Sequence, residues 1–402
     1  MESKKLREKV LVSLNIFLQL LGHSLYGVFI PIFLLKEGAT LPEVFIYGAM
    51  DGLGTLGGAL VGPAAVKKFG VKFPLVFRAL FQPLWVVGLL NHGKLPFPLP
   101  AYGFVFGAFT SVYWLAINAY TIEASSKKER GLFSGISSAM VWIASIIAPL
   151  IGAFIIGKFG YSAVFSLAIA VILLALVPAL LLPRLRLLDG AQTRTIPKKG
   201  GGTGRRNEIL GAFLLMYAIL GVGGLATYYA WPLYLYSVFG GELQIGLLAS
   251  LGSFFGLAGA LFGGWFADKM SKTRLVAASG SVLFFSWVLS AAFTSALALS
   301  IVVSFRRFAD EVTGNALFAK FGNLFARDNL IIRIAQKHFA LGAGLALAGA
   351  LACFVSIRTF FVLVGILFLV YAAAISGTVF RTGRKLALPR GMLIFLERFY
   401  QN

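Results

Sequence analysis

The sequence predicts an all-α integral membrane protein of twelve transmembrane helices, arranged as two six-helix bundles with both termini in the cytoplasm. Three observations predict this: the apolar content, the recurrence of long apolar runs, and the placement of basic residues. Hydrophobic residues make up 58% of the 402 residues and charged residues 13%, against about 45–50% and about 25% in soluble domains. One soluble core cannot bury so much apolar surface, so the bilayer is the natural solvent for this chain.

Apolar runs long enough to cross about 30 Å of hydrocarbon recur along the whole chain. We expect six helices near 10–34, 41–65, 73–91, 97–122, 131–156 and 161–182. We expect six more near 209–238, 244–267, 275–296, 298–321, 338–356 and 359–380. The run from Leu275 to Phe305 holds 31 residues, which is too long for one ordinary span. Length alone places a break near Thr294 and Ser295.

These runs divide the chain into four parts. An N-terminal six-helix bundle (1–182) precedes a cytoplasmic linker (183–208), a C-terminal six-helix bundle (209–380) and a basic cytoplasmic tail (381–402). The linker is rich in Gly, Lys and Arg, and no helical pattern continues through it.

The two halves also repeat a glycine pattern. Gly58-Ala-Leu-Val-Gly62 and Gly259-Ala-Leu-Phe-Gly263 lie 201 residues apart, each near the end of the second helix of its half. Repeats of this kind are typical of transporters whose binding site lies between the halves.

The basic residues give the predicted orientation. The formal net charge is +21, and 29 of the 36 Lys and Arg residues fall in turns on one side of the predicted bundle, four of them in an expected turn at 320–337. The turns of the other side hold only Lys36, Lys94, Lys158 and Arg358. By the positive-inside rule, the basic side faces the cytoplasm. The charge is therefore a topological signal that also favours anionic lipid, and we expect no nucleic-acid partner.

A turn in the second half joins a glycine, an acidic residue and several basic residues, in the stretch Gly264-Trp-Phe-Ala-Asp268-Lys269-Met-Ser-Lys272-Thr-Arg274. The first half carries a degenerate copy in which Lys67 takes the acidic position and Gly70 is kept. This stretch resembles the loop signature of the major facilitator superfamily.

The fifth predicted helix carries small residues and a proline at Gly135, Ala144, Ala148, Pro149, Gly152 and Ala153. Their spacing is similar to the antiporter motif of the same superfamily, with alanine at three glycine positions. Small residues of this kind also allow ordinary close packing of helices. Glu129-Arg130-Gly131 resembles the superfamily turn that precedes this helix. The usual arginine of the fourth helix is missing here, so the superfamily's standard proton-coupling scheme does not carry over.

The resemblance implies a gate on the cytoplasmic side. Asp268, with Lys269 beside it, would accept hydrogen bonds from the backbone amides at the start of the fifth helix, near Arg130. A carboxylate is stabilised at a helix N-terminus. Lys67 cannot serve a helix N-terminus in this way, so we expect the two halves to be unequal. The alternative for Asp268 is an ordinary solvated loop charge.

Four charged residues lie within the tenth predicted helix, Arg306, Arg307, Asp310 and Glu311. They lie about 12–20 Å below its outer end at 1.5 Å per residue, where each charge costs about 2.5–3.5 kcal/mol on the insertion scale. Arg306 and Asp310, like Arg307 and Glu311, have i,i+4 spacing and can pair within the helix. We expect Asp310, with Arg306 as its partner, to face a solute cavity while the other pair braces a neighbouring helix. The alternative is a wholly structural salt-bridge cluster.

In the superfamily, the first, fourth, seventh and tenth helices line the cavity. The resemblance therefore adds candidates for solute or proton binding, namely Gln19, His23, Tyr113, Trp114, Asn118 and Asn315. Imidazole titrates near neutral pH, which makes His23 a candidate proton carrier, although simple hydrogen bonding is the alternative. We expect Tyr228 to Trp231 to be interfacial aromatic residues, and Asp51 and Arg78 to form a structural pair.

The predicted function is secondary active transport of a small solute by alternating access, with proton-coupled efflux preferred because of the fifth-helix motif. Asp310 or Glu311 would bind the proton. The alternative within transporters is uptake of an anionic or sugar-like solute held by Arg306 and Arg307. The alternative of another class is a membrane-embedded lipid-modifying enzyme.

We expect no enzyme activity, cofactor or metal. The single cysteine, Cys353, excludes a cysteine-based metal site, and the three histidines are scattered over different segments. The predicted partners are the solute, protons and the lipid bilayer, for a monomer in the cell membrane.

Overall fold

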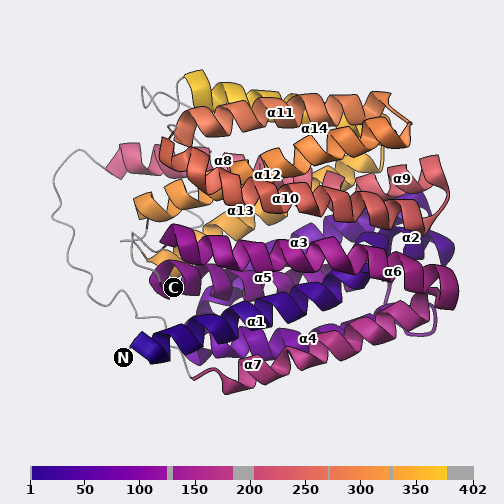
Figure 1. Ribbon diagram of the computed structural model, residues 1–402, viewed down its shortest axis with the longest axis horizontal. Coiled ribbons are helices and arrows are strands. Elements are labelled where there is room, and N and C mark those ends of the chain that lie inside the picture. Colours follow the sequence, from indigo (N-terminus) through magenta and orange to yellow (C-terminus); the bar gives the residue numbers. More distant parts are fainter. Residues whose placement is uncertain (1, 125–129, 184–202, 270–271, 326–328, 378–402) are drawn as a thin grey trace.

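The computed structural model describes residues 2–124, 130–183, 203–269, 272–325 and 329–377. Side chains are described for 6–121, 139–183, 208–263, 274–325 and 329–373. All regular elements in these ranges are helices (Figure 1). The linker residues 184–202 and the tail from 378, together with the predicted domain at 381–402, lie outside the described residues.

The first half consists of helices that follow the predicted apolar runs. They are α1 (Glu2–Tyr26), η1 (Gly27–Phe29), α2 (Ile30–Lys36), α3 (Leu41–Phe69), α4 (Lys72–Leu90), α5 (Leu99–Ala124), α6 (Arg130–Leu174) and α7 (Leu176–Leu181). Thr40 begins α3 with a capping box, accepting from the Glu43 amide while its own amide donates to the Glu43 carboxylate. Within α6 the backbone turns at Gly160, whose φ of 79° is in the region that favours glycine.

The second half follows the same order. Its elements are α8 (Thr203–Leu225), η2 (Ala226–Ala230), α9 (Trp231–Phe239), α10 (Glu242–Lys269), α11 (Lys272–Ala292), α12 (Ala296–Phe325), α13 (Leu330–Ala352) and α14 (Ile357–Gly377). Because α11 ends at Ala292 and α12 begins at Ala296, the predicted break near Thr294 and Ser295 is confirmed.

One predicted boundary is wrong. A basic turn is expected at 320–337, whereas α12 continues to Phe325 and α13 begins at Leu330. Arg333 and Lys337 therefore lie inside a helix, and the Lys337 side chain is 9% exposed. The basic residues suggested a loop, but the apolar residues between them continue the helical pattern of α13.

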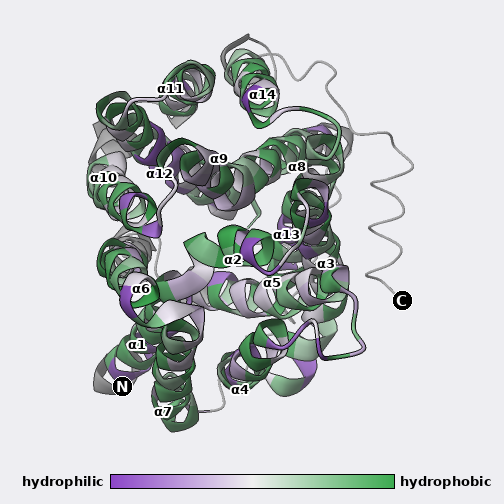
Figure 2. Ribbon diagram, turned by 90° about the vertical axis from the view of Figure 1, so that its right-hand side faces the viewer, coloured by the Kyte–Doolittle hydropathy of each residue, from purple (hydrophilic) through white to green (hydrophobic). Residues whose placement is uncertain are grey.

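The two halves pack with the same internal pairing. In the first half α3 lies against α5 and α1 against α6, and in the second half α10 lies against α12 and α8 against α13. The halves meet where α3 contacts α13 and where α6 contacts α10. Figure 2 shows the helices end on, with much of each ribbon coloured green for hydrophobic residues.

The repeated glycines are positions of close helix approach. A Cβ added at Gly58 would lie 2.3 Å from the Ala108 carbonyl oxygen of α5, and one added at Gly259 would lie 2.6 Å from the Phe308 carbonyl oxygen of α12. Only glycine permits such approach of one backbone to another. The repeat found in the sequence is therefore a repeat of packing.

The structure adds a second repeat that the sequence analysis missed. The first helix is interrupted by a 3₁₀ turn before Pro31, and the corresponding helix of the second half is interrupted by a π-turn before Pro232. These prolines are 201 residues apart, the same interval as the glycines. Interrupted helices at matching positions of two halves indicate a binding site.

Nine helices in the described ranges are long and apolar enough to cross a membrane, by length and composition alone. Large apolar side chains are exposed on several of them, including Leu84 at 68% and Leu347 at 71%. Exposed apolar surface on this scale suits lipid contact rather than water. The chain is therefore a multi-pass membrane protein, and its regular elements are helices throughout the part that the structure describes.

Candidate functional site

A cavity of about 720 Å³ lies between the two halves. Its walls come from α1, α3, α4, α5 and α6 on one side, and from α8, η2, α10, α12 and α13 on the other. The lining includes charged, amide, hydroxyl and aromatic side chains. A mostly apolar chamber that carries a few charged and polar groups, at the interface of two bundles, is the expected place for a solute.

On α12, one face of the helix lies on the cavity. Arg307, Glu311 and Asn315 follow each other at i,i+4 spacing and all three line the chamber. Asn315 Nδ2 donates to Glu311 Oε1 at 2.8 Å. Three of the predicted candidates are thus brought together on one wall.

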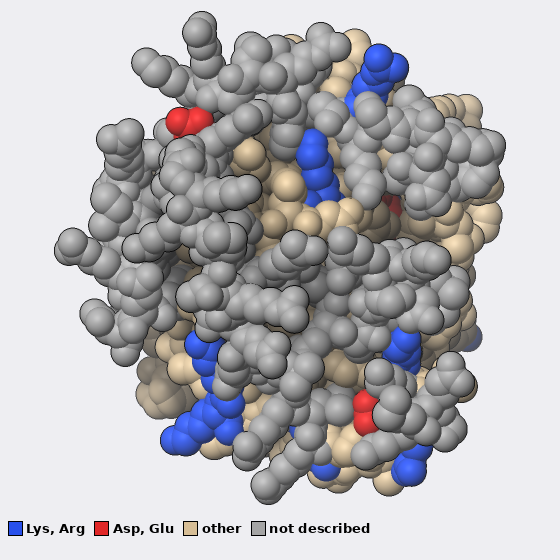
Figure 3. Space-filling view, turned by 90° about the vertical axis from the view of Figure 1, so that its left-hand side faces the viewer, with Lys and Arg blue, Asp and Glu red and all other residues tan. Residues whose placement is uncertain are grey.

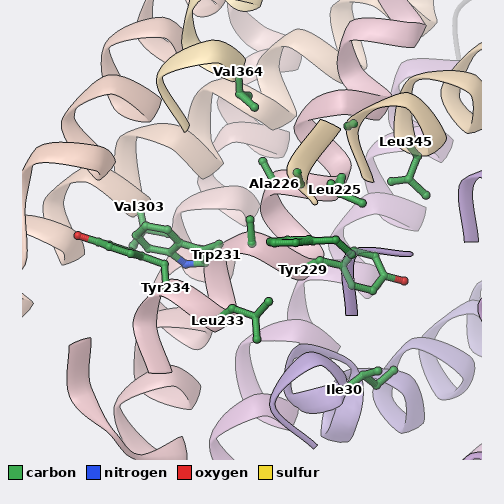
Figure 4. Packing of buried hydrophobic residues seen from close by; sticks show 14 of the residues in the cluster. Ile30, Leu225, Ala226, Tyr229, Trp231, Leu233, Tyr234, Val303, Leu345 and Val364 are labelled. Atoms are coloured by element: carbon green, nitrogen blue, oxygen red, sulfur yellow. The ribbon is translucent and has the colours of Figure 1, made fainter. Parts of the chain in front are cut away.

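Arg306 does not lie on this wall, contrary to the expectation. Its side chain is fully buried, with the guanidinium carbon 4.0 Å from the centre of the Trp231 ring and 4.1 Å from that of Trp287. Its Nη1 donates to Ser290 Oγ at 3.3 Å. Arg306 therefore braces α12 against α9 and α11. Figure 4 labels Trp231 of α9 and Val303 of α12, which belong to the same buried cluster.

The predicted cavity pair of Arg306 and Asp310 is therefore not formed. Neither residue is among those that line the chamber. The ion pair found within 4.0 Å between described residues is a different one, which joins Lys36 and Glu242. The helical spacing allowed either i,i+4 pair to face the cavity, and packing against two indole rings turns Arg306 away from it.

The first-half candidates divide in the same way. His23, Trp114 and Asn118 line the chamber. Gln19 and Tyr113 are fully buried outside the lining, and the Tyr113 hydroxyl donates to Asn15 Oδ1 at 3.2 Å. These two belong to the packing of the first half.

His23 has an aromatic setting. Its ring stacks on Phe106, with centroids 5.4 Å apart and planes at 23°, and its Nδ1 lies 3.4 Å from the Tyr26 hydroxyl. It contacts the cavity but makes no ion pair with a described residue.

The expected Asp51–Arg78 pair is also wrong. Asp51 Oδ2 accepts from the Tyr229 hydroxyl at 2.8 Å, and Arg78 Nε donates to Gln82 Oε1 at 3.0 Å. Asp51, Arg78 and Tyr229 all line the chamber. Tyr229, which was expected to be interfacial, is 5% exposed and lies in η2, where its hydroxyl contacts Asp51 of the first half.

Two cavity residues, Lys337 and His338, are not among the predicted candidates. Lys337 was expected in the turn at 320–337, and His338 was counted among the scattered histidines. Lys337 Nζ lies over the Phe318 and Tyr217 rings at 4.6 Å and 5.4 Å, and His338 Nε2 lies 3.1 Å from Asn118 Nδ2. The apolar period that precedes Lys337 was the signal that would have placed both residues on a helix.

Three polar contacts join the halves at different depths. Lys36 Nζ lies 2.5 Å from Glu242 Oε1 at the end of the bundle where α2 ends and α10 begins. Asp51 contacts Tyr229 in the chamber wall, and Asn118 contacts His338 further toward the opposite end. The chamber therefore has cross-half contacts on both sides of its centre.

Motif residues of the fifth predicted helix serve packing. A Cβ added at Gly152 would lie 1.9 Å from the Leu25 carbonyl oxygen, and one added at Gly246 of α10 would lie 2.7 Å from the Pro149 carbonyl oxygen. Pro149 also lines the chamber. Gly135 falls in α6 but outside the residues whose side-chain surroundings are described.

Of the predicted gate, only the first-half positions can be described. Lys67 is exposed in the last turn of α3, and Gly70 ends that helix with a φ of 76°. The side chains of Asp268, Lys269 and Arg130 lie outside the described residues. Figure 3 shows the end of the molecule that carries these turns, where blue Lys and Arg outnumber red Asp and Glu among the coloured residues.

Comparison with known proteins begins with sequence. The profile of the Major Facilitator Superfamily matches residues 12–328. The uncharacterized protein YqgE of Bacillus subtilis is 28% identical over 170 residues, which cover 41% of this chain and 39% of YqgE. The putative metabolite transport protein YyaJ of the same organism is 24% identical over 167 residues, which cover 41% of this chain and 36% of YyaJ. Each match spans less than half of the relative's length.

Solved structures match over nearly the whole chain. The xylose transporter XylE of E. coli, in a partially occluded inward open conformation, has a TM-score of 0.71 and 14% identity, covering 95% of this chain and 99% of XylE. A variant of the fucose:proton symporter FucP of E. coli has a TM-score of 0.63 and 14% identity, covering 92% and 98%. At this identity the likeness shows a shared fold.

Proposed function

This chain belongs to the major facilitator superfamily, and on that premise we propose that it moves a small polar solute through the central chamber by alternating access. The observation that carries the proposal is the chamber itself, which lies between two repeated halves and has cross-half polar contacts on both sides. Such contacts can be broken one side at a time, which is what alternating access requires.

We propose twelve membrane crossings. Of the nine apolar spans, Ala139–Leu181 turns back at Gly160 and would cross twice. Helix α12 carries charges that lower its hydropathy, and the apolar part of α14 is shorter, yet α12 pairs with α10 and α14 with α11. Both termini and the linker would face the cytoplasm of the cell membrane by the positive-inside rule. One chain encloses a whole chamber, so a monomer is sufficient.

The proton-binding group in this proposal is Glu311. It lines the chamber and its carboxylate accepts from Asn315, whereas Asp310 is not among the lining residues. A carboxylate that faces a cavity inside the membrane can exchange a proton with water and alter its contacts when it does so. Glu311 therefore replaces Asp310 as the preferred coupling residue.

The preferred direction remains efflux, with protons moving inward, and it rests on the resemblance of the fifth helix to the antiporter motif. A second candidate is uptake together with a proton. The fold likeness to a fucose:proton symporter favours this second candidate.

Reconstituted protein would test the proposal. Flux of radiolabelled sugars, organic acids and amines into proteoliposomes would be compared with and without an imposed pH gradient. We expect at least one solute to accumulate only when the gradient is present, with the sign of the effective gradient giving the direction. Glu311→Gln should abolish the gradient-driven part and keep solute exchange, while Asp310→Asn serves as the control. Gradient-driven flux that survives Glu311→Gln would contradict the coupling role.

A further inference from the structure

The charged residues on the chamber wall are not balanced. Among the described residues, three cations line it, Arg78, Arg307 and Lys337, against two carboxylates, Asp51 and Glu311. The carboxylates and the cations also differ in how their hydrogen bonds are satisfied.

Both carboxylates have neutral donors from the protein. Asp51 accepts from the Tyr229 hydroxyl and Glu311 from the Asn315 amide, each at 2.8 Å. Neither carboxylate lies within 4.0 Å of a Lys or Arg nitrogen of another described residue. Neither of them therefore makes a close ion pair with a cation of the lining.

The cations form no ion pair within 4.0 Å with a described residue. Arg307 Nε has no hydrogen-bond acceptor there, and neither has Arg78 Nη1, although Arg78 is 2% exposed. Lys337 lies against aromatic rings rather than a carboxylate, with its side chain 9% exposed. An unpaired cation in a membrane-spanning bundle is unfavourable unless it faces water or an anion.

The cations lie at different depths. Arg307 and Phe318, which contacts Lys337, are eleven residues apart on α12, or about 16 Å along the helix axis. Arg307 and Lys337 therefore occupy different levels of the chamber. Arg307 is therefore the cation that can anchor a solute at the centre of the chamber. Lys337 lies nearer the end at which α12 finishes.

The surroundings of Arg307 suit a hydroxylated molecule. Its side chain packs on Gly252, where an added Cβ would lie 3.1 Å from the Arg307 Cγ atom. Asn315, Ser145 and Ser253 line the same chamber, and Trp142 adds an apolar face. A planar guanidinium offers paired donors to a carboxylate.

Resting on the proposed transport function, we infer that the solute is a hydroxylated organic acid whose carboxylate binds Arg307 at the centre of the chamber. Lys337 attracts the anion at the end of the chamber where α12 finishes. Because three cations and two carboxylates line the chamber, an acid binds better than a neutral molecule of the same shape.

Matched pairs of molecules test this inference. D-glucuronate and D-glucose share a pyranose ring, and D-gluconate and D-glucitol share an open chain, so the members of each pair differ at a single carboxylate. Thermal unfolding of the purified full-length protein would be followed against concentration of each compound, at constant ionic strength set with NaCl. A ligand that binds the folded state raises the midpoint by mass action.

We expect the acid of at least one pair to bind about ten- to a hundredfold more tightly than its neutral partner, as for one charge-assisted hydrogen-bonded contact. Arg307→Met should remove this advantage, and Arg307→Lys should keep part of it. Lys94→Met removes an exposed positive charge outside the chamber and should leave the advantage unchanged.

Equal shifts for acid and neutral partner in both pairs would overturn the inference, and so would an acid advantage that survives Arg307→Met. If Arg307→Met folds poorly, the wild-type comparison and Arg307→Lys still decide the matter. Proteoliposomes separate the two levels of the account. If Arg307→Met still transports a neutral or cationic solute, the transport function stands and the inference about the acid is wrong. If the acids bind but no solute is transported, the inference about the acid stands and the proposed transport function is wrong.

Discussion

The contact between Lys36 and Glu242 should control the opening of one end of the chamber. Lys36 Nζ lies 2.5 Å from Glu242 Oε1, and the Tyr161 hydroxyl donates to the same oxygen at 3.0 Å. Lys36 comes from the first half and Glu242 from the second, so this end cannot separate while the pair is intact. We expect Lys36→Met to shift the protein toward states that are open at this end.

The size of the effect follows from exposure. The Lys36 side chain is 41% exposed and that of Glu242 12% exposed. A fully exposed ion pair contributes about 0.2–1 kcal/mol, and a hydrogen bond to a charged group about 1.5–3 kcal/mol. Loss of this half-exposed pair should cost a free energy between these values, at about 1–1.4 kcal/mol. The hydrogen bond from Tyr161 to Glu242 remains in Lys36→Met and keeps the cost just below the range for charged groups. This corresponds to about a five- to tenfold change in the ratio of open to closed states.

Distances between spin labels would measure this ratio. Labels at Lys94→Cys, after α4, and Arg358→Cys, at the start of α14, report on the same end of the two halves. Lys158→Met removes a nearby basic residue that contacts Phe154 of its own helix, and it should leave the distances unchanged. The distance shifts caused by Lys36→Met and by Glu242→Gln should not add up in the double variant, because both substitutions remove the same contact. Unchanged distances in both single variants, or fully additive shifts in the double variant, would show that this contact does not control opening.

Three further predictions concern stability and topology. Arg306→Lys keeps the charge but loses the planar group held between two indole rings, and it should lower stability by about 1–3 kcal/mol, seen as a lower unfolding midpoint in detergent. Gly54→Ala places a Cβ 1.9 Å from a carbonyl oxygen of α5 and should lower stability by about 1–3 kcal/mol, by the same measurement. Its control, Gly57→Ala, has its nearest contact at 3.5 Å and should leave stability nearly unchanged. Cysteines at Lys67 and Lys94, in a cysteine-free background, should react with an impermeant thiol reagent from opposite sides of the membrane, and labelling of both from one side would contradict the topology.

The helices were predictable because bilayer thickness fixes their length. Even the break near Thr294 followed from length alone. The error at the start of α13 arose because Arg333 and Lys337 resemble loop residues in a membrane protein, while the chamber allows both residues inside a helix. Polar side chains within a span were thus the least reliable guide to its ends.

The candidate site was predictable only in part. Helical spacing gave two i,i+4 pairs on α12, but only packing against Trp231 and Trp287 shows that Arg306 braces neighbouring helices while Arg307 faces the chamber. The contact of Asp51 with Tyr229 joins residues 178 positions apart, and no local pattern encodes it. The repeated prolines were a usable signal for the interrupted helices, and the sequence analysis overlooked them.

Alternating access requires the two halves to separate at the Lys36 end, so joining them covalently there should stop transport. In a protein with Cys353→Ser, cysteines at Lys36→Cys and Glu242→Cys would be joined by a short bifunctional thiol reagent with a reducible link, and flux would be measured in proteoliposomes before and after reduction. We expect joined protein to carry no solute and reduced protein to recover its flux, with either single-cysteine variant unaffected by the reagent. Undiminished flux through fully joined protein would show that solute passes without separation of this end, and would contradict the account.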